Sequence, residues 1–326
     1  MGEKSMTSKV FVAGHNGMLG SALVRRLKTE PDVQILLASR DHLDIESQLE
    51  VQEFLEEHKP DVVICAAARV GGIHDNATHQ YDFLIKNLRI QTNLIQASVE
   101  VGIRKLVFIG SSCIYPKHAV QPIEEESLLS GPLESTNFGY ATAKICGIQT
   151  VAAVHAQFPN RFDYRSVMPC NLYGLRDSYK GKDAHVIPAL IQRFHEAKCN
   201  KLRRVDVWGD ENVLREFLYV DDCADAIVHL TGVSESDFAR TASPETRMIN
   251  VGSGREITIR DLALTISKVV DYEGEIFFDS SKPAGTPRKI LDISRLLSTG
   301  WSPKIMLEEG LRLTYQDYKS QVQPGW

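Results

Sequence analysis

Short apolar segments alternate with helical patterns along the first half of the chain, and this alternation restricts the possible folds more than any other feature. Segments that are apolar without interruption are typical of strands buried on both faces, as in a parallel sheet covered by helices. We therefore expect an α/β protein with a doubly wound parallel sheet. The expected strands are 9–14, 33–39, 61–68, 105–112 and 162–169, and the two longest expected helices are 81–101 and 138–156.

The first expected strand runs directly into a turn with three evenly spaced glycines. Gly14, Gly17 and Gly20 open a helix in the spacing G-x-x-G-x-x-G. Glycine permits a tight turn and lets backbone N–H groups approach a pyrophosphate, whose charge is favoured at a helix N-terminus. Three glycines also suit an ordinary strand–helix turn. Their place after the first strand of an alternating chain favours a dinucleotide site of the Rossmann type.

Arg40 ends the second expected strand, about twenty residues beyond the last glycine of the turn. Sites for NAD usually carry an acidic residue there, which binds the ribose 2′-hydroxyl, whereas an arginine suits the 2′-phosphate of NADP. A solvated surface arginine is the alternative. The sequence therefore predicts NADP(H) as the cofactor.

Tyr140 and Lys144 lie four residues apart in the segment GYATAK, hence on one face of a helix. A lysine ammonium beside a phenol stabilises the phenolate. We therefore expect a lowered tyrosine pKa and proton exchange near neutral pH. Taken alone, the pattern Y-x-x-x-K is common on amphipathic helices, so its meaning depends on the glycine turn that precedes it.

Together, the glycine turn and the Tyr140–Lys144 pair resemble the extended short-chain dehydrogenase/reductase family. That family uses Ser, Tyr and Lys, with the serine at the end of the fourth strand, and Ser111 has that position. The resemblance extends over essentially the whole chain, to members that act on GDP-sugars. The segments that carry it are AAARVGGI, GSSCIYPK, YRSVMPCNLYG, HVIPALIQRFHEA and KPAGTPRKILD.

The resemblance implies conversion of GDP-4-keto-6-deoxy-D-mannose to GDP-L-fucose, by epimerisation at C3 and C5 and then NADPH-dependent reduction at C4. The C4 ketone acidifies the protons on C3 and C5, and inversion needs a base and an acid on opposite faces of the sugar. The resemblance gives these roles to Cys113 and His185, whose side chains can titrate near neutral pH. Either residue alone would more often be structural. The resemblance also implies a homodimer, formed through the helices 81–101 and 138–156.

Three sets of site residues follow from the same resemblance. The catalytic set is Ser111, Cys113, Tyr140, Lys144 and His185. The cofactor set is Gly14, Gly17, Met18, Gly20, Arg40, Asp44, Ala67, Tyr140, Lys144, Asn171 and His185. The substrate set is Ser112, Asn171, Arg193, Trp208, Arg215, Arg288 and Lys289, whose cations suit the two phosphates of GDP.

The regular alternation loosens after Gly174, which suggests a second domain. We expect an NADP-binding Rossmann domain over 8–174, with a later contribution from about 217–252. A smaller substrate-binding domain is expected from 175–216 and 253–326. The polar run 234–247 is expected to be a surface loop.

Composition excludes several classes of function. A net charge of −5 argues against a nucleic-acid partner. No apolar run approaches the roughly 18 residues of a membrane span, and the first residues lack the apolar core of a signal peptide. The six cysteines are scattered without a C-x-x-C pair, which indicates reduced thiols and a cytoplasmic location. We expect no metal, because metal-ligand spacings such as H-E-x-x-H are absent.

Two other interpretations stay open. One is a relative that epimerises or dehydrates another nucleotide sugar with tightly held NAD. The other is a non-catalytic NADP-sensing protein of the same fold, against which the complete catalytic set argues. Asn16 stands where bacterial relatives commonly carry an arginine that holds the 2′-phosphate, so the expected preference for NADP depends on Arg40.

Arg40→Asp should shift the preference of the protein from NADPH towards NADH. Loss of a charge-assisted contact worth about 1.5–3 kcal/mol corresponds to roughly ten- to over a hundredfold weaker use of NADPH. The ratio of kcat/KM for the two cofactors measures the shift. An unchanged ratio would refute the role of Arg40.

Overall fold

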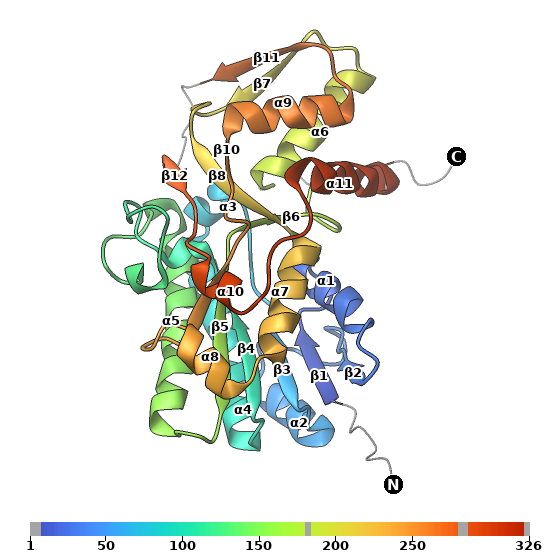
Figure 1. Ribbon diagram of the computed structural model, residues 1–326. Helices are drawn as coiled ribbons and strands as arrows, with labels where there is room; N and C mark the ends of the chain where they lie inside the picture. The colour runs from blue at the N-terminus through green and yellow to red at the C-terminus, as the bar shows by residue number, and fades with distance from the viewer. Residues whose placement is uncertain (1–7, 180–183, 280–285, 323–326) are drawn as a thin grey trace.

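The computed structural model describes residues 8–179, 184–279 and 286–322. Its central element is a six-stranded sheet in the order β2-β1-β3-β4-β5-β9, with every neighbouring pair parallel (Figure 1). The doubly wound α/β fold expected from the sequence is confirmed. The strands are β1 (Ser8–Ala13), β2 (Val33–Leu36), β3 (Val62–Cys65), β4 (Lys105–Ile109), β5 (Asp163–Pro169) and β9 (Met248–Val251).

Helices cover both faces of this sheet. One layer contains α1 (Met18–Leu27) packed against α7 (Val220–Gly232), and the other contains α2 (Gln48–His58), α4 (Gln80–Val101) and α5 (Phe138–Gln157), as Figure 1 shows. The two longest expected helices correspond to α4 and α5. Within the described chain, no helix is long and apolar enough to cross a membrane.

The strand order reverses at β1. The chain passes from β1 to β2 on one side and then crosses to β3 on the other side of β1. The connections after β1 and β3 therefore diverge, which opens a crevice at the carboxyl ends of these strands. In open α/β sheets, ligands bind at such a switch point.

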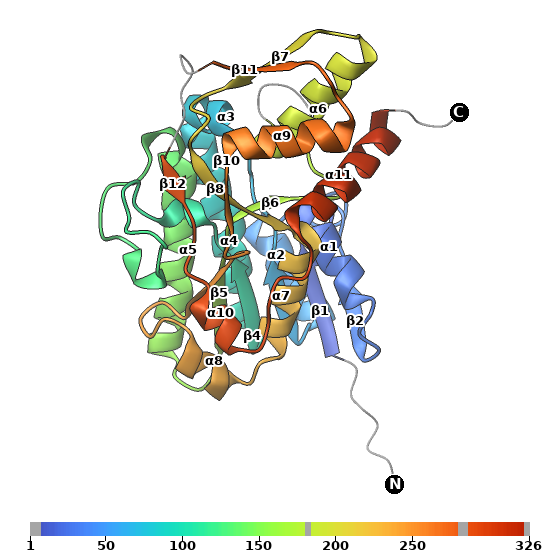
Figure 2. The same cartoon turned by 45° about the horizontal axis from the view of Figure 1, so that its top comes forward.

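A second group of elements lies beyond the carboxyl ends of the sheet. It has its own hydrophobic cluster, in which Phe194, Leu262 and Leu311 are fully buried. Figures 1 and 2 both show this group at the top of the molecule. The domain limits expected from the sequence stay a prediction. The elements of the group are α6 (Val186–Cys199), β7 (Arg204–Trp208), α9 (Ile259–Val270), β11 (Glu275–Asp279) and α11 (Leu307–Val322).

A four-stranded assembly centred on β8 joins the two groups. β8 pairs with β6, β10 and β12, so it connects the end of β5, the segment after β9 and a late segment of the chain. Residues that are far apart in sequence meet along this strand. The bounds are β6 (Asn171–Tyr173), β8 (Leu214–Tyr219), β10 (Glu256–Thr258) and β12 (Arg288–Lys289).

The expectation of a surface loop over 234–247 is wrong. The segment contains the helix α8 (Glu235–Thr241), which begins where the Ser234 hydroxyl accepts a hydrogen bond from the N–H of Asp237 at 3.1 Å. Phe238 on this helix is fully buried beneath the guanidinium of Arg165, 4.4 Å from its ring centroid. The buried Phe238 side chain anchors the helix, and Ala242 at its C-terminal end is buried as well. The other short helices are α3 (Ile73–Thr78) and α10 (Ser294–Ser298), with 3₁₀ turns at Ser112–Ile114, Glu125–Ser127 and Ser135–Asn137.

Gly20→Ala should destabilise the fold, whereas Gly17→Ala should have little effect on it. A Cβ at Gly20 would lie 2.0 Å from the backbone oxygen of Gly14, but one at Gly17 would lie 3.5 Å from the same atom. The first contact forces the backbone to shift, at a cost of at least about 2 kcal/mol. The second is ordinary contact, and we expect a change within about 1 kcal/mol. Urea unfolding followed by circular dichroism measures both, and equal stabilities would contradict the geometry.

Candidate active site

The glycine turn lies at the switch point of the sheet, between β1 and α1. Gly14 adopts a φ of +86°, and a Cβ there would lie 2.6 Å from the backbone of Ala67, which follows β3. The N–H of Gly17 donates to the oxygen of Gly14 at 3.0 Å, and α1 begins at Met18. Within the described chain no side chain caps this helix. Its first N–H groups can therefore bind an anion such as a pyrophosphate.

Arg40 follows β2 at the same edge of the sheet. Its side chain is exposed and forms no ion pair within the described chain, so its charge is available to a ligand. The Asp44 carboxylate accepts a hydrogen bond from the N–H of Glu46 at 2.9 Å and shapes the turn that follows. The glycine turn and Arg40 fit a phosphate-bearing dinucleotide, in which Arg40 would bind the 2′-phosphate.

Ser111 and Cys113 stand at the carboxyl end of β4. The Ser111 hydroxyl accepts a hydrogen bond from the N–H of Cys113 at 3.2 Å and so begins the 3₁₀ turn Ser112–Ile114. The same hydroxyl is hydrogen-bonded to the phenol of Tyr140 on α5. Cys113 is half-buried, whereas Ser112 is buried. The sequence pattern thus places a hydroxyl, a thiol and a phenol at one strand end.

Burial controls the pKa of Tyr140, contrary to the expectation that Lys144 would lower it. Desolvation raises this pKa, the Cys113 sulfur adds to the rise, and the hydrogen bond with Ser111 acts in the opposite direction. The Lys144 Nζ lies 5.9 Å from the centroid of the Tyr140 ring and donates to the backbone oxygen of Ile109 at 2.7 Å. The phenol therefore keeps its proton at neutral pH, as a proton donor must.

Lys144 is the buried cation of the site. Its side chain is nearly inaccessible to water, and desolvation lowers its pKa from 10.5 to about 8. Its one described hydrogen bond goes to a carbonyl, so no carboxylate partner within the described chain compensates the charge. The group therefore holds a proton at pH 7 but can release it at mildly alkaline pH.

The two residues of β12 are the cations Arg288 and Lys289, and their side chains reach different partners. The Arg288 guanidinium forms an ion pair with Glu256 at 2.7 Å. The Lys289 Nζ lies 3.7 Å from the Sγ of Cys113. Of these neighbouring cations, it is Lys289 that reaches the strand end at Ser111.

His185 and Asn171 enter from the segments that follow β5. His185 directly precedes α6, and its backbone oxygen accepts a hydrogen bond from the N–H of Ala189 at 3.0 Å, whereas its imidazole forms no hydrogen bond with the residues that the structure describes. More than a third of the residue is exposed, yet the protein atoms around its ring lower its pKa by desolvation. The Asn171 amide donates to the backbone oxygen of Glu216 at 2.8 Å. No described contact joins His185 to Cys113, so their pairing stays a prediction.

Three residues of the expected substrate set lie in the second group of elements or on the strand β8 that adjoins it. The Arg193 guanidinium stacks 4.4 Å above the ring of Trp208, which is 52% exposed. Arg215 on β8 is partly buried, and desolvation lowers its pKa to about 10. A guanidinium stacked on an indole offers both a flat surface and a charge, which suits a nucleotide.

A buried carboxylate that sequence reasoning missed organises this edge of the site. Glu216 is inaccessible to water and accepts hydrogen bonds from the N–H groups of Gly254, at 2.8 Å, and Leu291, at 2.9 Å. It therefore ties β8 to the segments that follow β9 and β12. A signal was present in the sequence, because Glu216 is an acid inside the apolar strand segment REFLYV.

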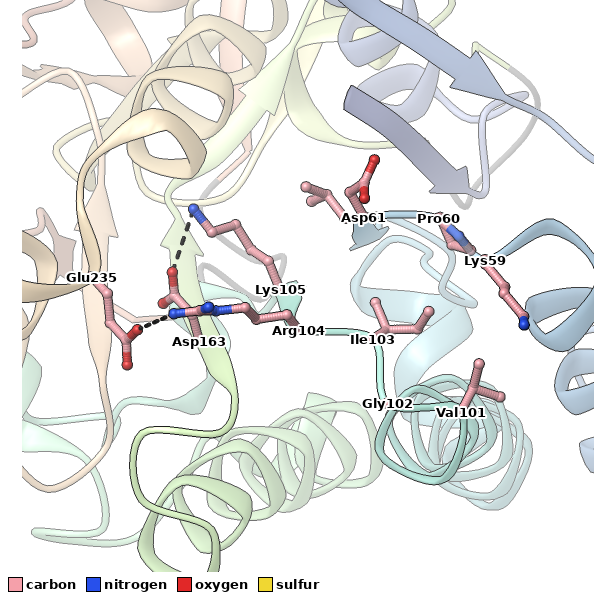
Figure 3. Close-up of a pocket in the computed structure, with 11 residues that line it drawn as sticks. Lys59, Pro60, Asp61, Val101, Gly102, Ile103, Arg104, Lys105, Asp163 and Glu235 are labelled. Carbon is pink, nitrogen blue, oxygen red and sulfur yellow. Dashed lines mark ion pairs between the residues drawn. The ribbon is translucent and has the colours of Figure 1, made fainter. Parts of the chain in front are cut away.

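One hollow of the molecule lies away from this site. It occupies about 620 Å³ at the amino ends of β3, β4 and β5, opposite the edge that carries Ser111. Figure 3 shows the ion pairs Lys105–Asp163 and Arg104–Glu235 beside it. These ion pairs join the amino end of β4 to β5 and the residue before β4 to α8. The described chain contains no group of three His, Cys, Asp or Glu side chains that could hold a metal ion.

Comparisons with known proteins found clear relatives of this chain. A model described as the NAD dependent epimerase/dehydratase family matches residues 10–252. GDP-L-fucose synthase 1 of Arabidopsis thaliana is 48% identical over 99% of this chain and 96% of that protein. GDP-L-fucose synthase of Escherichia coli (strain K12) is 48% identical over 94% of this chain and 95% of that protein. The structure of a GDP-mannoheptose C4 reductase from Campylobacter jejuni with NADP bound is 32% identical, covers 98% of this chain and 100% of that one, and has a TM-score of 0.85.

Lys144→Met should stabilise the protein at pH 7, and this gain should shrink as the pH rises. Below pH 8 the lysine is charged in both the folded and the unfolded chain, so the full cost of burial, about 3 kcal/mol, opposes folding. Above pH 10.5 it is neutral in both states and that cost disappears. Loss of the hydrogen bond to Ile109 offsets part of the gain.

The measurement is urea unfolding of both proteins at pH 7 and pH 10, between which the difference should shrink by about 2 kcal/mol. Lys268→Met, on the exposed face of α9, is the control and should show no such trend. A difference that does not change with pH would mean that Lys144 is not desolvated.

Proposed function

The chain belongs to the NAD dependent epimerase/dehydratase family, and from this premise we propose that it converts GDP-4-keto-6-deoxy-D-mannose to GDP-L-fucose. The reaction is epimerisation at C3 and C5, followed by NADPH-dependent reduction at C4. One observation carries the proposal: the half-buried thiol of Cys113 shares a strand end with the Ser111–Tyr140 pair. A reductase needs the hydroxyls and the lysine, but not the thiol. The 48% identity to GDP-L-fucose synthases supports the same conclusion.

The cofactor is NADP(H), which supplies the hydride for C4 when it is bound. The glycine turn and the exposed guanidinium of Arg40, which have no capping side chain and no ion-pair partner among the described residues, fit its pyrophosphate and its 2′-phosphate. Met18 and Ala67 flank that turn, and Asp44 shapes the chain beyond Arg40. Tyr140, Lys144, Asn171 and His185 complete the set of residues that we propose to contact the cofactor.

Reduction at C4 uses the proton of Tyr140. The raised pKa keeps the phenol protonated at neutral pH, and its hydrogen bond with Ser111 brings both hydroxyls to one place. Ser111 would orient the C4 oxygen, and Tyr140 would give that oxygen a proton as the carbonyl becomes a hydroxyl. The positive charge of Lys144 would stabilise the phenolate that remains.

Epimerisation precedes the reduction and uses Cys113 and His185. The Cys113 thiolate takes a proton from the carbon beside the ketone, and the electron pair of that C–H bond moves onto the C4 oxygen as an enolate. His185 then delivers a proton to the opposite face of the carbon, so the centre inverts. Desolvation lowers the pKa of His185, and its imidazolium is therefore a readier acid than a solvated one.

The GDP part of the substrate would bind across the second group of elements. The stacked pair of Arg193 and Trp208 suits the base or a phosphate, and Arg215 adds a partly desolvated cation. Ser112 and Asn171 would line the sugar. Arg288 already forms an ion pair with Glu256, so it would bind a phosphate only after that ion pair breaks.

A homodimer formed through α4 and α5 is part of the proposal. These helices pack side by side, and Tyr81 and Phe138 near their N-terminal ends are 72% and 52% exposed. Sedimentation velocity tests this assembly, and a monomer at micromolar concentration would exclude it. The cytoplasm is the proposed location, because all six cysteines are free thiols, as in a reducing compartment.

Identification of the product tests the function directly. Purified protein, GDP-4-keto-6-deoxy-D-mannose and NADPH should yield GDP-L-fucose, identified by mass spectrometry and NMR. A product inverted at only one carbon, or not reduced, would point to another nucleotide-sugar enzyme of the family. Absence of any turnover, with NADPH still bound, would favour a cofactor-sensing protein.

Two substitutions should separate the two chemistries. Tyr140→Phe removes the proton donor and should slow NADPH oxidation by about 10²–10⁴-fold, while deuterium uptake at C3 and C5 continues. Cys113→Ser should instead impair the epimerisation. Deuterium uptake at C3 and C5 should be nearly abolished, since a hydroxyl is a far weaker base than a thiolate. NMR of the product in deuterated water follows both. Full inversion at the wild-type rate in Cys113→Ser or in His185→Gln would mean that another group performs the epimerisation.

A further inference from the structure

We infer that Lys289 is a positioning residue for the epimerisation, whose ammonium group stabilises the Cys113 side chain as the thiolate that removes the proton. The inference rests on the proposed function and gives Lys289 a different role from binding of a GDP phosphate. Its starting point is the distance of 3.7 Å between the Lys289 Nζ and the Cys113 Sγ.

This distance suits a hydrogen bond from an ammonium to sulfur, which is a larger acceptor than oxygen. Both residues are half-buried, so water screens their interaction only in part. The thiolate, not the thiol, is the reactive form of cysteine, and an adjacent lysine is one of the features that favour it. Lys289 therefore favours the form of Cys113 that the first chemical step requires.

The backbone holds Lys289 in this position from both sides. On one side, β12 pairs with β8, and the Glu216 carboxylate accepts a hydrogen bond from the N–H of Leu291 at 2.9 Å. On the other side, the Gln121 side chain accepts from the N–H of Ile290 at 2.9 Å. Gln121 belongs to the loop that continues from Cys113. The thiol and the lysine are thus anchored to the same segment of chain.

The neighbouring charges leave Lys289 free for this role. The Glu256 carboxylate forms its ion pair with the adjacent Arg288. Lys289 forms no ion pair with a carboxylate in the described parts of the chain. From α5, Tyr140 and Lys144 are the titratable groups at the same strand end. Burial raises the pKa of Tyr140, so the phenol carries no charge that would oppose the thiolate, and Lys144 is held on the Ile109 carbonyl.

Alkylation of Cys113 by iodoacetamide, without substrate, tests the contact. Peptide mass spectrometry gives the rate at Cys113 relative to that at Cys199, an exposed thiol in the same molecule. Lys289→Met should slow alkylation at pH 7 by about three- to thirtyfold. Lys289→Arg keeps a cation and should restore most of the rate.

Arg288→Met is the matched control, because it removes the adjacent cation on the other side of the strand. We expect it to leave the alkylation rate of Cys113 at the wild-type value. Thermal melting and NADPH fluorescence should show that every variant is folded. Wild-type alkylation in folded Lys289→Met would overturn the inference, as would an equal loss in Arg288→Met.

Turnover then separates this role from phosphate binding. Lys289→Met should lower kcat for deuterium uptake at C3 and C5, whereas loss of a phosphate ligand would raise KM and leave alkylation unchanged. The proposed function can fail independently. If the wild-type protein does not convert the GDP-sugar but Lys289→Met still slows alkylation, the lysine–thiol contact stands and the assigned reaction falls.

Discussion

The backbone hydrogen bonds that hold six strands in parallel are the constraint on which the rest of this protein depends. Parallel pairing requires every strand to be followed by a crossover, so all carboxyl ends meet at one edge of the sheet. The glycine turn after β1, Ala67 after β3 and Ser111 after β4 are therefore neighbours by topology. The reversal of strand order at β1 then opens the crevice between them.

Desolvation determines how the polar groups at this edge can react. It raises the pKa of Tyr140 and lowers that of Lys144 to about 8, so burial moves both groups towards their neutral forms. Cys113 lies closer to the surface and next to the Lys289 ammonium. A protonated phenol from α5 and a thiol beside a cation from β12 therefore meet at the carboxyl end of β4, which allows proton donation and proton removal at adjacent places.

The second group of elements is attached through β8 and its buried carboxylate. Glu216 binds N–H groups from the segments after β9 and β12, and without them its charge would be unpaired inside the protein. Burial raises the pKa of Glu216, which shows that these hydrogen bonds only partly replace water. The Glu216 carboxylate thus helps to hold β12, and with it Lys289, in position, together with β8 and Gln121.

Local pattern alone was enough to predict the sheet, the two long helices, the glycine turn and the shared helix face of Tyr140 and Lys144. Each of these depends on residues close together in the chain, through backbone period or turn geometry. Local pattern failed where buried side chains outweighed a polar run, as with Phe238, and where burial reversed the expected pKa of Tyr140. Only the tertiary structure decided that Lys289 meets Cys113 across 176 residues of chain while Arg288 turns to Glu256. Tertiary packing determines the distances between side chains and how far each is removed from water. The spacing of residues along the sequence predicts neither.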